Sequence, residues 1–238
     1  MSYSFTGFAY LILVFALGCS IYRFFQYCRK EKDIVSKCFL YIAVLFEIFA
    51  FSKAIGGLFF ANNPAFLEIT VDIAAFIQAL AFAILAYLII HLKFPQISPW
   101  FGFIPVLVLG LIVTGLNIIT FYHPFLEPSG AINWGLSSVP LTLSLLRTFL
   151  FFITFIPMSI VFSQQFKIAK ESYVKKKTFV MIIFFLLAFV VALLDFLFIS
   201  IFRLEAIWRD ITLIILSIIL FLTSIIPPKP SPRYVKKI

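Results

Sequence analysis

Charged residues are scarce in this chain. Asp, Glu, Lys and Arg make up 12% of its 238 residues, whereas they make up about a quarter of a typical soluble domain. A soluble protein of this length needs a polar shell around its core, and so few charged residues cannot provide one. The composition therefore excludes an ordinary soluble globular protein.

Histidine and cysteine are also rare, with two and three residues respectively. His91 and His123 fall near opposite ends of the predicted membrane segments, so they cannot share a haem or a metal ion. Cys19 lies in the first apolar segment, and Cys28 and Cys38 flank the first basic turn. Because none of the three lies in a segment that we predict outside, we expect free thiols and no external disulfide, metal centre or cofactor.

Catalytic motifs are missing as well. Ser144 and Ser200 have no general base near them in the sequence. The last apolar segment has no lysine between Arg209 and Lys229, so it cannot hold retinal as a Schiff base. We therefore expect that the protein is neither an enzyme nor an opsin-like photoreceptor.

Long apolar segments are what the sequence does contain. Hydrophobic residues make up 63% of the chain, and they gather in segments of about 20 residues, enough to cross a hydrocarbon layer of roughly 30 Å. Such segments must be helices, because lipid offers the backbone no hydrogen-bond partner, and the alternation of a membrane barrel is absent. We predict an all-α polytopic membrane protein with a single domain over 1–238. Its seven transmembrane helices lie at about 4–26, 37–60, 66–91, 100–121, 140–163, 178–202 and 208–226, followed by a short basic tail at 227–238.

Lysine and arginine are divided unequally between the two ends of these helices. Of the 19 in the chain, fifteen lie at one set of ends or in the tail, and only Arg203 and Arg209 lie at the other set. Positive residues are retained on the cytoplasmic side, so we predict an outer N-terminus and a cytoplasmic C-terminus in the cell membrane. The net charge of +9 then fits a membrane surface, and we expect no nucleic-acid partner.

Four charged residues lie at a similar depth inside the predicted helices. Lys53, Asp72, Arg147 and Asp195 are roughly 8–12 Å from the outer helix ends, taking 1.5 Å per residue. Two further polar residues accompany them, because Asn117 lies slightly above this layer and Asp210 begins the last helix. A charge at membrane depth is costly, so each of these residues is a candidate functional residue.

The helical phase of these charges predicts that they point inward. Asp72 is spaced three and four residues from a row of alanines, and Asp195 follows Ala188 and Ala192 in the same way. Small residues at this spacing line contacts between membrane helices. Two interpretations remain open. Either the four charges neutralise one another and fix the helix register, or they line a cavity open to the outside that binds a polar or zwitterionic ligand or an ion.

Glu47 lies deeper, at roughly 20 Å, and Gln78 lies at a similar depth. A neutral carboxyl group hydrogen-bonded to a neighbouring helix is one interpretation of Glu47. The other is a proton- or ion-linked switch, shared with Gln78.

The basic segment 164–177 is the longest predicted inner loop. Its Lys175, Lys176 and Lys177 predict contact with anionic lipid, and docking of a cytoplasmic protein is the alternative.

The function that this pattern favours is a receptor-like or sensory module that signals to a separate cytoplasmic partner. Its layout is similar to the seven-helix input domains of bacterial sensor proteins, in topology alone. In this mechanism an outside ligand rearranges the charged layer, and the fifth helix flexes near Pro157. The alternatives are a small secondary transporter coupled to a proton or ion through Glu47, and a structural or assembly subunit. Internal repeats typical of transporters are not evident in the sequence.

Overall fold

The computed structural model describes residues 3–31, 33–120, 124–134 and 140–225. Seven helices in these ranges are long and apolar enough to cross a membrane, which confirms the predicted all-α polytopic fold. In chain order the elements are α1 (Phe5–Glu31), α2 (Ile34–Phe59), α3 (Pro64–Lys93), α4 (Trp100–Ile119), β1 (Phe125–Leu126), β2 (Ile132–Asn133), α5 (Leu141–Ile168), α6 (Ser172–Leu193), a π-helical segment (Leu194–Ile199), α7 (Ser200–Phe202) and α8 (Ile207–Ile225). The sixth membrane span runs without interruption from α6 through the π-helical segment into α7.

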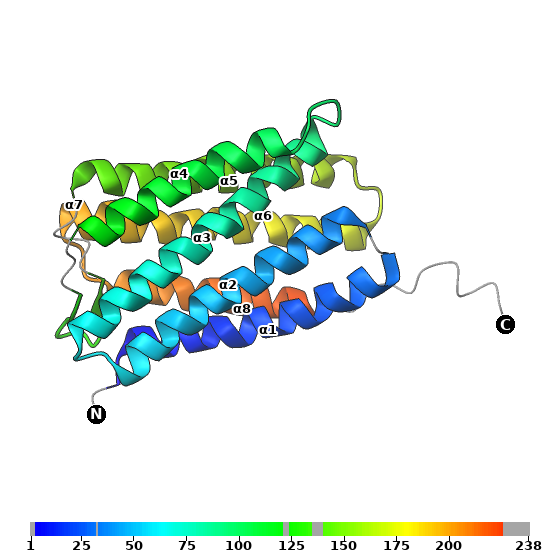
Figure 1. Ribbon diagram of the computed structural model, residues 1–238. Helices are drawn as coiled ribbons and strands as arrows, with labels where there is room; N and C mark the ends of the chain where they lie inside the picture. Colours follow the sequence, from blue (N-terminus) through cyan, green and yellow to red (C-terminus); the bar gives the residue numbers. More distant parts are fainter. Residues whose placement is uncertain (1–2, 32, 121–123, 135–139, 226–238) are drawn as a thin grey trace.

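The long helices lie side by side in one bundle (Figure 1). α1 packs on α2 and α8, α3 packs on α2, α4 and α5, and α6 packs on α5 and α8. Six helices thus close a ring, while α4 lies mainly against α3. Large apolar side chains such as Phe15, Phe101 and Ile118 are exposed on the outside of the bundle. Because bulky apolar groups belong in hydrocarbon, this surface fits a lipid bilayer and the chain is a multi-pass membrane protein.

Capping residues in the sequence set two of the helix starts. The Asp33 carboxylate accepts a hydrogen bond from the Ser36 backbone N–H at 2.5 Å, and the Asn63 side chain accepts one from the Phe66 N–H at 3.3 Å. Pro64 follows Asn63 at the first helical position, where a missing N–H costs nothing. α2 and α3 therefore begin a few residues before the helix starts that the apolar segments predict, at 37 and 66.

The predicted 164–177 loop is wrong in extent. α5 continues to Ile168 and α6 begins at Ser172, so the connection between them is much shorter. Gln and Lys are strong helix formers, and the helices therefore continue beyond the apolar residues. Lys175 and Lys176 are exposed in the first turns of α6, and the side chain of Lys177 lies outside the described residues.

The predicted outer loop between α4 and α5 folds back into the bundle, which the sequence did not indicate. β1 and β2 pair antiparallel across a turn that contains Gly130 at a φ of +79°. The Phe5 N–H donates to the Gly130 carbonyl at 2.7 Å, and Ala131 and Ile132 are fully buried. The hairpin is thus part of the core at this end of the bundle.

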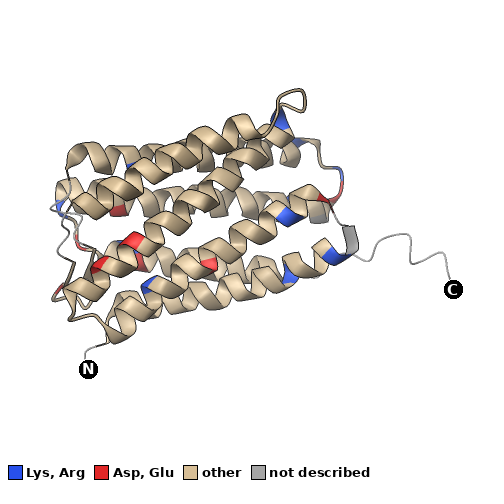
Figure 2. Ribbon diagram, in the orientation of Figure 1, with Lys and Arg blue, Asp and Glu red and all other residues tan. Residues whose placement is uncertain are grey.

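The two ends of the bundle differ in charge. Figure 2 shows most Lys and Arg near the end that carries the α5–α6 turn, and most Asp and Glu nearer the end that carries the hairpin. This distribution agrees with the predicted inner and outer ends. The orientation in the membrane stays a prediction.

Candidate functional site

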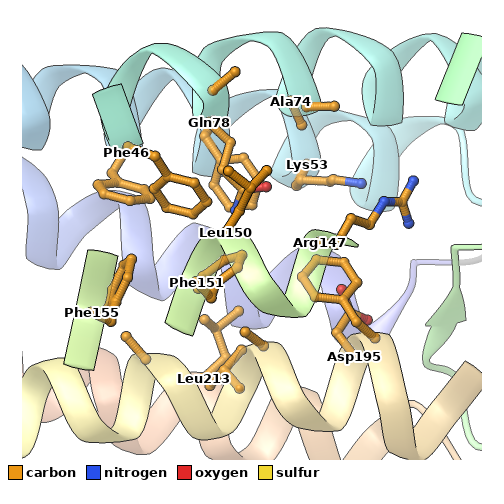
Figure 3. A pocket seen from close by; sticks show the side chains of 18 of the residues that line it. Phe46, Lys53, Ala74, Gln78, Arg147, Leu150, Phe151, Phe155, Asp195 and Leu213 are labelled. Atoms are coloured by element: carbon orange, nitrogen blue, oxygen red, sulfur yellow. The ribbon is translucent and has the colours of Figure 1, made fainter. Parts of the chain in front are cut away.

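A cavity of about 150 Å³ lies in the centre of the helix ring. Its walls come from all seven spanning helices and from Trp134, which follows the hairpin. Most of the lining is apolar, and its aromatic residues include Phe82 and, labelled in Figure 3, Phe46, Phe151 and Phe155. Small residues let α3 and α4 pack closely beside the cavity. A Cβ atom added at Gly110 of α4 would lie 2.6 Å from the Cβ of Ala79 of α3.

Lys53 is the most unusual residue of the lining. Only 5% of its surface is exposed, and its ammonium group lies 3.6 Å from the centroid of the Trp134 ring. Within the described ranges no carboxylate lies within 4 Å of it. A buried ammonium group is normally paired with an acidic group, whereas Lys53 has a cation–π contact and no such pair among the described residues.

Arg147 is the second cation of the cavity. It is 6% exposed, donates a hydrogen bond to the Asn117 side-chain oxygen, and lies 5.4 Å from the centroid of the Phe196 ring. The structure therefore confirms that Arg147 points inward. Figure 3 shows Lys53 and Arg147 at the same end of the cavity, with Asp195 below Arg147 in this view.

Asp195 is bound from the other side by Arg209. The guanidinium donates to Asp195 at 2.9 Å and to Asp210 at 2.8 Å, and it also donates to the Ile132 carbonyl of the hairpin at 3.0 Å. Thr6 of α1 completes the cluster, because its hydroxyl donates to Asp210 and accepts a hydrogen bond from the Ile132 N–H at 2.7 Å. We call these five residues the Arg209 cluster.

Arg209 corrects the sequence analysis. The sequence places Arg209 at an outer helix end, but its side chain is fully buried and joins α1, the π-helical segment, α8 and the hairpin. The sequence contains one indication of this ion pair, since Arg209 and Asp210 are adjacent at the start of an apolar helix. The burial of Arg209 also depends on the hairpin, which supplies the Ile132 carbonyl. The position of this hairpin cannot be inferred from the sequence of an irregular loop.

The structure does not close the four predicted charges into two ion pairs. Lys53, Arg147 and Asp195 line the cavity with Asn117, but the described partner of Asp195 is Arg209. Asp72 is half-buried and is not part of the lining, and its Oδ1 atom has no hydrogen-bond partner in the described part of the chain. Asp210 is fully buried in the Arg209 cluster and does not line the cavity.

Glu47 and Gln78 are not brought together in the cavity. Gln78 lines it, whereas Glu47 is absent from the lining and faces α1. A side chain at Gly18 of α1 would lie 3.4 Å from the Glu47 Oε1 atom. The proposed switch at Glu47 therefore stays untested by the geometry.

Trp134 lines the cavity, although it is not among the candidate site residues predicted from the sequence. It is 2% exposed, and its ring lies against the Lys53 ammonium group. Its indole Nε1–H is buried and has no acceptor among the residues that the structure describes. A buried indole N–H normally finds a partner, so this donor is a further polar group of the site.

The π-helical segment carries Asp195 to the cavity. It begins at Leu194, directly after α6, and includes Phe196, which also lines the cavity. π-helical turns are rare and are frequently found at functional sites. No pattern in the sequence distinguishes it from an α-helix.

A second cavity of about 100 Å³ continues towards the opposite end of the bundle. It shares Leu17, Phe46, Phe155 and Phe184 with the first cavity and reaches Arg23. These four shared residues form an apolar collar between the two spaces.

In the described ranges, no group of three or more His, Cys, Asp and Glu residues is placed to hold a metal ion. The sequence matches no protein-family model, no curated protein and no solved structure.

Proposed function

We propose that the chain is a receptor-like sensory module of the cell membrane, which binds a small ligand in the central cavity and signals to a separate cytoplasmic partner. The observation that carries this proposal is Lys53, a buried cation at a cavity wall with no acidic partner within 4 Å in the described part of the chain. In a purely structural set of charges each cation would be expected to have an acidic partner, as Arg209 has in Asp195 and Asp210.

The path for a signal follows from the elements that line the cavity. α5 and α6 contribute wall residues and both extend to the predicted cytoplasmic end. α5 contains Pro157, and α6 leads into the π-helical segment, so each has a place where its hydrogen-bond ladder is interrupted. A ligand that binds one arrangement of these helices more tightly shifts the population towards it. The exposed Lys175 and Lys176 of α6 then offer a contact for a cytoplasmic partner or anionic lipid.

A cavity-filling substitution tests this coupling without a known ligand. Ala192 is buried in the lining, and Ala192→Phe places a ring in the space that a ligand would take. Spin labels at Gln165 and Lys176, both exposed on the predicted inner ends of α5 and α6, would report the distance between the helices in lipid nanodiscs. We expect Ala192→Phe to shift the main distance by about 1–2 Å or more, the scale of helix shifts in switching proteins.

Cys19, Cys28 and Cys38 are first replaced by serine so that the labels attach only at the chosen sites. Gly115→Phe is the matched control, because a side chain at Gly115 meets nothing within 4 Å in the described structure. An unchanged distance in a folded Ala192→Phe protein would contradict the receptor proposal.

A secondary transporter is the second candidate, and the two cavities in line favour it. A route past the collar of Leu17, Phe46, Phe155 and Phe184 would join the predicted outer and inner ends. The test is uptake of labelled amino acids and carboxylates into proteoliposomes under a proton gradient, with wild type and Glu47→Gln compared. Uptake that Glu47→Gln abolishes would replace the receptor proposal by the transporter.

A further inference from the structure

We infer that the central cavity selects a small organic carboxylate with an apolar body, whose carboxylate lies against Lys53 and Arg147. This inference names the ligand class of the proposed receptor site and rests on that proposal. The cavity, the charges of its lining and its aromatic wall each support one part of it.

The charges of the lining favour an anion. Two cations, Lys53 and Arg147, face the cavity, and one carboxylate, Asp195, faces it with them. Asp195 is already paired with Arg209 at 2.9 Å, whereas no carboxylate of the described residues lies within 4 Å of the Lys53 ammonium group, which faces the Trp134 ring. An entering carboxylate places a counter-ion beside Lys53, which has none within 4 Å among the described residues, and the burial of the ammonium group strengthens the attraction.

Hydrogen-bond donors dominate the same end. The Lys53 ammonium and the Arg147 guanidinium can each donate to a carboxylate, and the guanidinium is held in place by Asn117. The buried Trp134 N–H has no acceptor among the described residues and belongs to the same wall. A ligand with hydrogen-bond acceptors therefore pairs with the donors at this end of the cavity better than a ligand with donors does.

The rest of the cavity limits the ligand's size and shape. The rings of Phe82 and Phe151 meet edge to face at 4.6 Å between centroids, and Phe46 lies 6.2 Å from Phe82. An apolar cavity of about 150 Å³ holds benzene, so we expect a ligand of roughly six to ten non-hydrogen atoms. The aromatic wall accepts a ring in offset or edge-to-face contact.

A matched set of probes tests the ligand class on the full chain in nanodiscs by isothermal titration calorimetry. Phenylacetate has the carboxylate and the apolar ring, phenylacetamide replaces the charge by a neutral amide, phenylglycine adds an ammonium group, and benzylamine carries the ammonium alone. We expect phenylacetate to bind at least about tenfold more tightly than each of the others, because only it supplies an anion without a second charge.

Variants of Lys53 assign the binding to the cavity. Lys53→Met should weaken phenylacetate binding at least about tenfold, whereas Lys53→Arg should retain most of it, because the positive charge remains. Lys37→Met is the control, since Lys37 is exposed on the same helix, and it should leave the affinity unchanged. Ala192→Phe should block binding by filling the space, which provides a second test if Lys53→Met does not fold.

Several results would overturn the inference. Equal binding of phenylacetamide, or tighter binding of benzylamine, would remove the role of the two cations. Tighter binding of phenylglycine would mean that Asp195 binds the ammonium group of the ligand and that the site prefers a zwitterion. If no probe binds while Ala192→Phe still moves the spin labels, the ligand class is wrong and the receptor proposal stands. If phenylacetate binds but the labels do not move, the site stands and the receptor proposal fails.

Discussion

Arg209 and Lys53 are two buried cations at the same end of the bundle, and they have opposite surroundings. Arg209 donates to Asp195, Asp210 and a backbone carbonyl, so its guanidinium is surrounded by acceptors. Lys53 has the face of Trp134 at 3.6 Å and no carboxylate within 4 Å in the described structure. Trp134 is near both cations, because its ring centroid also lies 6.0 Å from the Arg209 guanidinium carbon.

The contrast separates a structural charge from a candidate binding charge. A charge in the centre of a membrane helix costs about 2.5–3.5 kcal/mol on insertion scales, and a desolvated cation–π contact offsets roughly 2 kcal/mol of such a cost. Arg209 is stabilised further, because it joins α1, the π-helical segment, α8 and the hairpin through several charge-assisted hydrogen bonds. The Arg209 cluster therefore holds the hairpin end of the bundle together, whereas Lys53 is a candidate to bind a ligand.

The largest expected effect follows from removing Arg209. Arg209→Met leaves Asp195 and Asp210 without their cation, and Asp210 is fully buried. Breaking a buried pair in this way costs about 3–5 kcal/mol, so we expect a large loss in the free energy of unfolding by SDS in mixed micelles. Arg203→Met is the control, because Arg203 is exposed, and its effect should stay within about 0.5 kcal/mol. Equal stability of the two variants would show that the Arg209 cluster is dispensable.

Thr6 should have the next largest effect. Thr6→Val keeps the shape but removes the donor to Asp210 and the acceptor for the Ile132 N–H. Leaving buried groups unsatisfied costs about 1–3 kcal/mol, and we expect faster hydrogen exchange at the Ile132 amide as the hairpin loosens. Thr212→Val is the matched change, because the Thr212 hydroxyl bonds only to the Trp208 carbonyl of its own helix. Unaltered exchange at Ile132 would argue against the coupling of hairpin and helices.

The contact between Lys53 and Trp134 can be measured by a double-mutant cycle. Lys53→Met, Trp134→Leu and the double variant should give a coupling of about 0.5–2 kcal/mol in unfolding free energy, the range for cation–π pairs. A coupling near zero would mean that the ring does not stabilise the ammonium.

The smallest expected effect is that of Lys53→Met alone. Lys53 has no carboxylate within 4 Å among the described residues, so removing its charge also removes its desolvation cost. The unfolding free energy should therefore change by less than about 1 kcal/mol or rise. The same variant should lose phenylacetate binding. A destabilisation as large as that of Arg209→Met would give the two cations the same structural role and remove the contrast between them.

The sequence predicted the bundle well, for a physical reason. Lipid leaves the backbone of an apolar segment only one solution, so seven such segments are seven helices wherever they lie in the chain. The inward direction of Asp195 also followed from its three- and four-residue spacing to Ala188 and Ala192, which line the same cavity. Helix ends were predicted less well at α5 and α6, because Gln and Lys continue a helix beyond the membrane.

The sequence by itself thus determined the helices and the presence of costly charges between them. Only the tertiary structure decided which charges meet. Asp195 pairs with Arg209 because the π-helical segment and the hairpin bring α6, α8 and Ile132 together. Lys53 faces Trp134 because a loop that looks irregular in the sequence enters the core. Such partners lie far apart in the chain, and no local pattern encodes a contact that depends on how distant elements pack.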